Sequence, residues 1–142
     1  MSQTPLKIQM LTSGLLYQHY FEHIHYFAVT DITRETVDAA YEKVRELDTY
    51  YAENGLHVQY LYSLDQLRIT PYAALKIQKS VALSPDNLTE SIAIVASTFM
   101  STIINKLIIP LINDGEAHEI RFFHTDAEAF AWFEERRKEI GF

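Results

Sequence analysis

Short runs of apolar and aromatic residues recur along the chain and are separated by longer segments of a different spacing. Five runs rich in Val, Ile, Tyr and Phe predict β-structure, at residues 6–11, 15–30, 57–64, 92–96 and 119–124. The second run is longer than most single strands, so we interpret it as a hairpin that turns near Glu22 and His23. The fourth run lacks polar alternation, which is typical of a strand covered on both faces.

The segment after the hairpin has the periodicity of a helix. Apolar residues recur at helical spacing from Val37 to Tyr51. Asp31 or Thr33 can cap the start of this helix. Gly55 can adopt the left-handed conformation that ends it.

Two more helices are predicted from their first residues. Thr70-Pro71 places an N-cap before a proline in the first turn, and we extend that helix to about residue 83. The capping box Thr125-x-x-Glu128 opens a final helix over residues 126–139.

A further helix is predicted over residues 97–110, where Pro110 ends or kinks it. With the strand before it, this segment is nearly as long as a bilayer span, and Lys106 is its only charge. Its middle, however, is polar, and polar groups are most costly at the centre of a membrane. These polar residues are Ser97, Thr98, Ser101, Thr102 and Asn105. A buried strand followed by a helix is therefore the better interpretation.

Strands that alternate with helices predict an α/β fold. We expect a mixed, mostly parallel sheet, with an N-terminal antiparallel hairpin at its edge and four helices around it. The 142 residues fit a single domain, residues 1–142, with a core over about 15–140.

Composition and charge exclude several classes of protein. The chain has no cysteine, which excludes disulfides and thiolate sites. Its net charge is −7, and the 12 Lys and Arg residues are scattered, so we expect no nucleic-acid partner. The one basic cluster, Arg136-Arg137-Lys138, can simply complement the dipole of the last helix. The first residues do not form a secretory signal, so we expect a cytoplasmic protein.

Three stretches together resemble a known family. They are His57–Asp65 with Ile69–Ala74, Ser91–Ser97 with the apolar helix containing Asn105, and Ile120–Phe133. In order and spacing they are similar to the bacterial SpoIIAA-like proteins, which are relatives of the STAS domains of anti-sigma-factor antagonists. The resemblance implies the STAS fold and a non-enzymatic regulatory module that binds another protein. It also implies a switch loop, at Ser63, Asp65 and Thr70.

The same loop departs from the family pattern. Ser63 stands where members often carry Asp, and Thr70-Pro71 stands where the signalling proteins place a phosphorylatable Ser before Gly or Ala. A phosphate on Thr70 would meet the free N–H groups at the start of a helix. Alternatively, Thr70 is only the N-cap and Ser63 only ends a strand.

His19, His23 and His25 lie close together in the sequence and are the candidate metal ligands. On one continuous strand they would share a face. A hairpin turn at Glu22 and His23 would break that alignment, and we expect no bound metal.

Three apolar residues of the 99–112 segment lie off the stripe that faces the core. Phe99, Ile109 and Ile112 either become buried where Pro110 bends the chain or form an exposed patch. We expect a homodimer, and an exposed patch here would supply its contact. The alternative function is a carrier or sensor of an apolar, lipid-like small molecule, held between the Phe99–Ile112 helix and the sheet.

The sequence contains no recognisable catalytic motif. Its four glycines form no phosphate-binding loop, and neither a Gly-x-Ser-x-Gly elbow nor a His-Glu-x-x-His motif occurs. We therefore expect no enzymatic activity and no cofactor.

Overall fold

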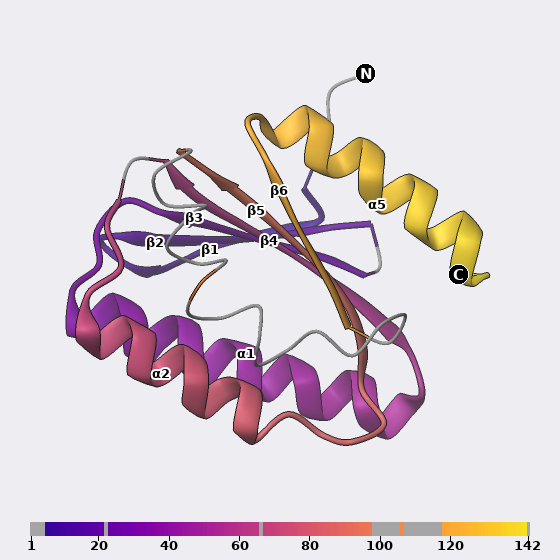
Figure 1. Ribbon diagram of the computed structural model, residues 1–142, viewed down its shortest axis with the longest axis horizontal. Coiled ribbons are helices and arrows are strands. Elements are labelled where there is room, and N and C mark those ends of the chain that lie inside the picture. Colours follow the sequence, from indigo (N-terminus) through magenta and orange to yellow (C-terminus); the bar gives the residue numbers. More distant parts are fainter. Residues whose placement is uncertain (1–4, 22, 66, 98–105, 107–117, 142) are drawn as a thin grey trace.

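The computed structural model describes residues 5–21, 23–65, 67–97, 106 and 118–141. Within them, one sheet has helices on both faces (Figure 1). The strands are β1 (Lys7–Thr12), β2 (Leu15–Tyr20), β3 (Ile24–Val29), β4 (His57–Asp65), β5 (Thr89–Ala96) and β6 (His118–Phe123). The helices are α1 (Arg34–Asn54), α2 (Pro71–Ala82) and α5 (Asp126–Ile140).

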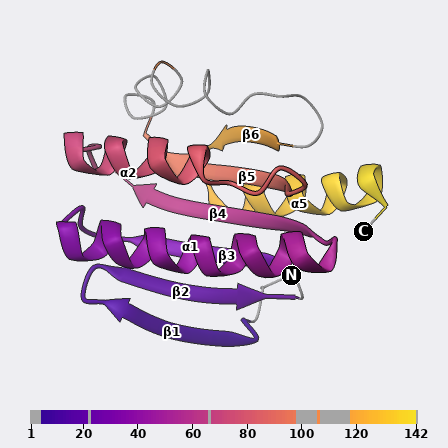
Figure 2. The same cartoon turned by 90° about the horizontal axis from the view of Figure 1, so that it is seen from below.

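The order of the strands in the sheet repeats their order in the chain (Figure 2). β1, β2 and β3 pair antiparallel, whereas β3 to β6 pair parallel. This confirms the predicted α/β class and the antiparallel N-terminal edge. Three helices lie in the described part of the chain. The fourth predicted helix, residues 97–110, lies outside it except for residues 97 and 106.

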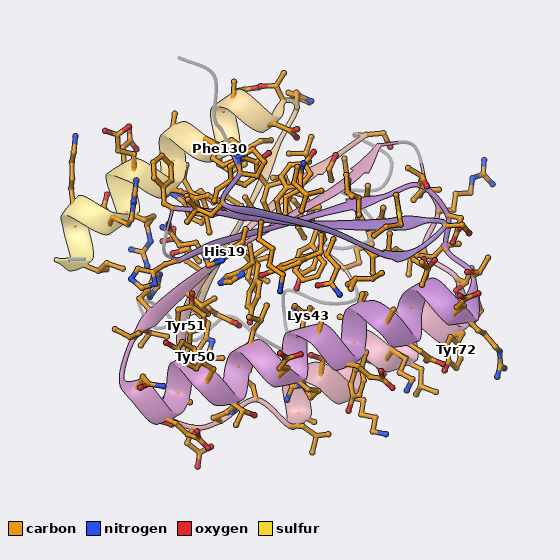
Figure 3. All side chains as sticks on the ribbon, turned by 180° about the vertical axis from the view of Figure 1, so that it is seen from behind. His19, Lys43, Tyr50, Tyr51, Tyr72 and Phe130 are labelled. Atoms are coloured by element: carbon orange, nitrogen blue, oxygen red, sulfur yellow. The ribbon has the colours of Figure 1, made fainter. Side chains whose placement is uncertain are left out.

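The two faces of the sheet carry different cores, because alternate side chains of each strand point to opposite sides. One core lies under α1 and α2 and is rich in aromatic residues, including Tyr17, Phe27 and Tyr60. The other is smaller and packs Trp132 and Phe133 of α5 against the sheet. Figure 3 shows this division, with Phe130 of α5 on one side of the sheet and Lys43 and Tyr51 of α1 on the other.

The helix ends form as the sequence predicts. The hydroxyl oxygens of Thr33, Thr70 and Thr125 each accept a hydrogen bond from a backbone N–H in the first turn of α1, α2 and α5. Gly55 follows α1 with φ of 64°, in the left-handed region. No helix in the described ranges is both long and apolar enough to cross a membrane.

Arg136 corrects the interpretation of the basic cluster as a simple dipole partner. It is only 5% exposed and lies beneath the last turns of α5. Its Nε is 3.2 Å from Glu119 Oε2. It also donates to the Ser91 hydroxyl, which lies 2.7 Å from Nε2 of His57. The residue therefore anchors α5 to the sheet.

A polar cluster joins the turn between β1 and β2 to the start of α1. The Asp31 carboxylate accepts three hydrogen bonds, from Thr33 N, Thr33 Oγ1 and Thr36 Oγ1. Thr36 Oγ1 also lies 2.8 Å from Thr12 Oγ1, which accepts from the Gly14 N–H. This leaves no space for a side chain at Gly14, because a Cβ there would lie 1.9 Å from Asp31 Oδ2.

We therefore expect Gly14→Ala to destabilise the protein by about 1–3 kcal/mol, since the Asp31 side chain must move and break its hydrogen bonds to make space for the methyl group. Urea unfolding measures the loss, and Ser13→Ala at the exposed neighbouring position is the matched control. In an Asp31→Ala background, Gly14→Ala should lower the free energy of unfolding clearly less. An equal loss of unfolding free energy in both backgrounds would contradict this explanation.

Candidate functional site

A cavity of about 370 Å³ lies between α1, α2 and the sheet. Its volume is near the lower end of the range for small-molecule pockets, about 300–1,000 Å³. Most of its wall is aliphatic, and the aliphatic residues include Val29, Ile32, Val37, Ala40, Val44, Leu64, Ile69, Ala73, Ile77, Ile92, Ile94 and Ile120. Such a wall suits an apolar molecule.

Polar groups gather at one end of the cavity. α1 and α2 both run back toward the edge where β4 and β5 begin, so their last turns meet the first residues of these strands. The polar or charged residues that line the cavity from this region are Arg45, Asp48, Tyr60, Ser80, Ser84, Glu90 and His118. The cavity is therefore amphipathic.

Asp48 is the centre of the polar end. It is 2% exposed, yet it carries a carboxylate. The Tyr60 hydroxyl donates to its Oδ1 at 2.6 Å, and Arg45 Nη2 donates to its Oδ2 at 2.5 Å. Arg45 Nη2 also donates to the Ser80 hydroxyl at 3.1 Å. One guanidinium thus connects α1 with α2.

Glu90 and His118 form a second pair at the same end. They stand opposite each other in the register of β5 and β6. His118 Nδ1 lies 3.1 Å from Glu90 Oε1, and both side chains are largely buried. The two acidic residues of the lining that are buried, Asp48 and Glu90, therefore each have a basic neighbour.

Burial controls the protonation of this group. Desolvation, together with the charge of Glu90, raises the pKa of Asp48 to about 6. The Tyr60 hydrogen bond and the charge of Arg45 act in the opposite direction on the same pKa. Burial also raises the pKa of Tyr60 and Tyr62 well above the usual value. At neutral pH Asp48 is thus ionised and both tyrosines are neutral.

Two hydrogen-bonding atoms in the cavity wall remain unused. Arg45 Nε and Ser84 Oγ are buried and have no hydrogen-bond partner among the described residues. Both residues line the cavity. A buried polar atom without a partner is costly and indicates a missing group.

The predicted switch-loop residues are divided between the two sides of the sheet. Ser63 stands opposite Val95, which belongs to the core under α5. Thr70 starts α2 on the other side, and its hydroxyl accepts from Ala73 N. Asp65 ends β4, and its side chain lies outside the described structure. The structure shows Thr70 as an N-cap, and its phosphorylation stays a prediction.

Ser63 lies close to a tyrosine of the neighbouring strand. Burial and a hydrogen bond with Asp126 raise the pKa of Tyr26 to about 12, and a hydrogen bond with Ser63 acts in the opposite direction on the same pKa. The Tyr26 hydroxyl donates to Asp126 Oδ2 at 2.7 Å and so links β3 to the start of α5. Ser63 thus belongs to the contact between the sheet and α5.

The histidine group forms an aromatic cluster. His19 and His25 face each other on β2 and β3, with ring centroids 4.5 Å apart. His25 is 2% exposed, and its two nitrogens lie 2.6 and 2.7 Å from the hydroxyls of Tyr17 and Tyr51. Burial lowers the pKa of His25 to about 3, so the ring is neutral. Within the described ranges no three acidic or histidine side chains are arranged to hold a metal ion.

The predicted interface residues Phe99, Ile109 and Ile112 lie outside the described residues. A ligand site between their helix and the sheet therefore stays a prediction. The cavity described above is in a different place, under α1 and α2.

Comparison with known proteins identifies no relative of this chain. No family model, no curated protein and no solved structure matches the chain. The resemblance to the SpoIIAA-like and STAS proteins therefore stays a prediction.

The residues at the polar end of the cavity were not singled out from the sequence. One signal for them does exist, because Asp48 lies four residues after Val44 and three before Tyr51, on the apolar stripe of α1. A carboxylate at such a position must be buried and partnered. Its partner Tyr60 and its neighbour Glu90 come from strands, and no spacing rule connects them to it.

We predict an unusual pH dependence from Asp48. Its pKa is raised in the folded state, so its contribution to stability is complete below the unfolded-state pKa of about 4 and is lost as the pH rises through about 6. The difference in unfolding free energy between wild type and Asp48→Asn should therefore fall by about 2 kcal/mol from pH 4 to pH 7. Urea unfolding at each pH measures this difference.

The matched control for this experiment is Asp38→Asn on the same helix. The hydrogen bond from Tyr72 lowers the pKa of Asp38. The difference in unfolding free energy between wild type and Asp38→Asn should therefore change with pH in the opposite direction. If Asp48→Asn gave the same difference at every pH, Asp48 would not be the titrating group.

Proposed function

We propose that the protein is a non-enzymatic binding module that holds a small, mostly apolar molecule in the cavity between α1, α2 and the sheet. The observation that carries this proposal is the cavity itself, with its aliphatic wall and one polar end. Pockets of this composition are typical of small-molecule sites, in which apolar contacts supply affinity and a few polar groups set orientation. The protein would then act as a carrier or a sensor of that molecule.

The proposal concerns binding and not catalysis because the buried carboxylates at the polar end of the cavity are each bonded to a neighbouring side chain. Asp48 is bonded to Arg45 and Tyr60. Glu90 is paired with His118. Such pairs keep charges stable in a buried wall, whereas a general acid or base must be available to a substrate.

Filling the cavity tests this proposal. Ala40→Phe places a large ring in the space between α1 and the sheet, and we expect it to weaken binding of the neutral fluorescent probe 1-naphthylamine at least about tenfold. Ala127→Phe, at an exposed position of α5, is the matched control and should leave binding unchanged. A fluorescence titration measures both variants, and the melting temperature of each confirms folding.

If the probe binds wild type and Ala40→Phe equally, the molecule is not held in this cavity. Mass spectrometry of gently purified wild-type protein under native conditions gives an independent readout. A retained small molecule would support the carrier.

A second candidate is the regulatory protein–protein module that the family resemblance implies, and the edge of the sheet favours it. β1 is an edge strand, and its register places Met10 on the same face as Leu16, away from α1. Leu6, Ile8 and Met10 are 67%, 59% and 63% exposed. α5 contacts β4, β5 and β6, so it does not cover this stripe. Exposed apolar stripes of this kind are typical of contact surfaces.

For this second candidate we take another copy of the chain as the partner. A two-fold axis at an antiparallel edge pairs the strand with itself and satisfies its free backbone groups. We expect wild type to sediment as a dimer and Ile8→Lys as a monomer. Gln9→Lys, on the opposite face of the same strand, should stay dimeric. A wild-type monomer at all accessible concentrations would contradict this contact.

A further inference from the structure

The polar end of the cavity carries information on the chemistry of the bound molecule. We propose that the ligand has an uncharged head whose oxygen accepts hydrogen bonds from Arg45 Nε and the Ser84 hydroxyl, with an apolar tail along the aliphatic wall. This inference rests on the proposed function, since it assigns a ligand class to the same cavity. Alcohols, amides and esters carry such a head.

The two unused atoms supply the first argument. Arg45 Nε and Ser84 Oγ are buried in the cavity wall, and neither has a partner among the described residues. An N–H group can only donate, and a hydroxyl can donate as well as accept. A ligand oxygen has two lone pairs, so it can accept from both atoms at once. A head that is only a donor would leave Arg45 Nε unpaired.

The position of these atoms is fixed by the bonds around them. Arg45 Nη2 is held by Asp48 and Ser80, which sets the plane of the guanidinium and therefore the direction of its Nε–H. Ser84 follows Ser80 by four residues, just past the end of α2, and its N–H donates to Val81 O. Arg45 extends from the middle of α1 to Ser80 in the last turn of α2, so both donors lie near the end of α2. They form a preorganised receptor for one head group.

The charges of the wall exclude an ionised head. Asp48 already balances the charge of Arg45 at 2.5 Å, so the guanidinium has no net attraction left for a carboxylate. Glu90 stands at the same end, and an anion there would meet two buried carboxylates. An ammonium would be attracted by the carboxylates, but it cannot accept a hydrogen bond from Arg45. A neutral oxygen accepts that hydrogen bond and is not repelled by the carboxylates.

The volume limits the size of the ligand. A water-sized group takes about 30 Å³ in the liquid, so a cavity of about 370 Å³ holds roughly a dozen non-hydrogen atoms. That excludes a whole phospholipid and fits a single short chain with a compact head. A ten-carbon chain with one head group is therefore a suitable probe.

Three probes with the same tail test the inference: 1-decanol, decanoate and decylammonium, at pH 7.5. Displacement of 1-naphthylamine from the wild-type protein gives the affinity of each. We expect 1-decanol to bind at least about tenfold more tightly than either charged probe, because only its head satisfies the wall without a charge penalty.

Two variants then locate the head. Ser84→Ala removes the hydroxyl, and Arg45→Lys keeps the charge beside Asp48 but lacks the Nε donor. Each should weaken 1-decanol about fivefold, whereas Ser13→Ala, at an exposed turn, should not change its affinity. Binding of the fluorescent probe confirms that each variant keeps its cavity, and Ser84→Ala suffices if Arg45→Lys does not fold.

The outcomes separate this inference from the proposed function. If decanoate or decylammonium binds as tightly as 1-decanol, the neutral head is wrong while the cavity stays a binding site. If 1-decanol binds both variants as it binds wild type, its head does not lie at Arg45 and Ser84. If neither the dye nor any of the three probes binds wild type, both proposals fail.

Discussion

The hydrogen bond from the Tyr60 hydroxyl to Asp48 determines how the larger layer of the molecule is built. Tyr60 is fully buried in the middle of the sheet, so its hydroxyl requires a partner inside the protein. Asp48 supplies it from α1 and must itself be buried to do so. A buried carboxylate requires a cation, and Arg45 provides one that extends to Ser80 of α2. One phenol thus connects the sheet with both helices.

This chain of polar contacts also explains why the space between the helices and the sheet is incompletely filled. Aliphatic residues of α1, α2 and the sheet line most of this space, while hydrogen bonds fix the directions of the Arg45 guanidinium and the Asp48 carboxylate at one end. The wall therefore changes from apolar to polar along the cavity.

Most of the fold could be predicted from local signals. The caps at Thr33, Thr70 and Thr125 and the glycine at position 55 act within a few residues of themselves, so the sequence alone locates the helix ends. The beginning of β5 was harder, because Glu90 and Ser91 do not look like strand residues. They lie in the sheet because His118 and Arg136, both distant in sequence, meet them there.

The candidate site could not be predicted in the same way. Two of its contacts join residues that are far apart in the sequence: Asp48 with Tyr60, 12 positions apart, and Arg45 with Ser80, 35 positions apart. Arg136 shows the same difficulty, since a helix-terminal arginine is usually exposed and this one is buried against Ser91. The residues predicted from the family resemblance lie in loops and at helix starts, where short sequence motifs occur. The positions of the buried polar groups depend on how the helices pack on the sheet, which short motifs do not predict.

The agreement between strand order and chain order has a consequence for synthesis on the ribosome. Each newly emerged strand finds its neighbour already made, so the sheet can grow by one strand at a time from the N-terminal hairpin. The docking of α5 comes later, because α5 follows every described strand in the chain. Until then, the apolar face of the sheet that packs against α5 is exposed to solvent. A chaperone would protect the nascent chain most during that interval.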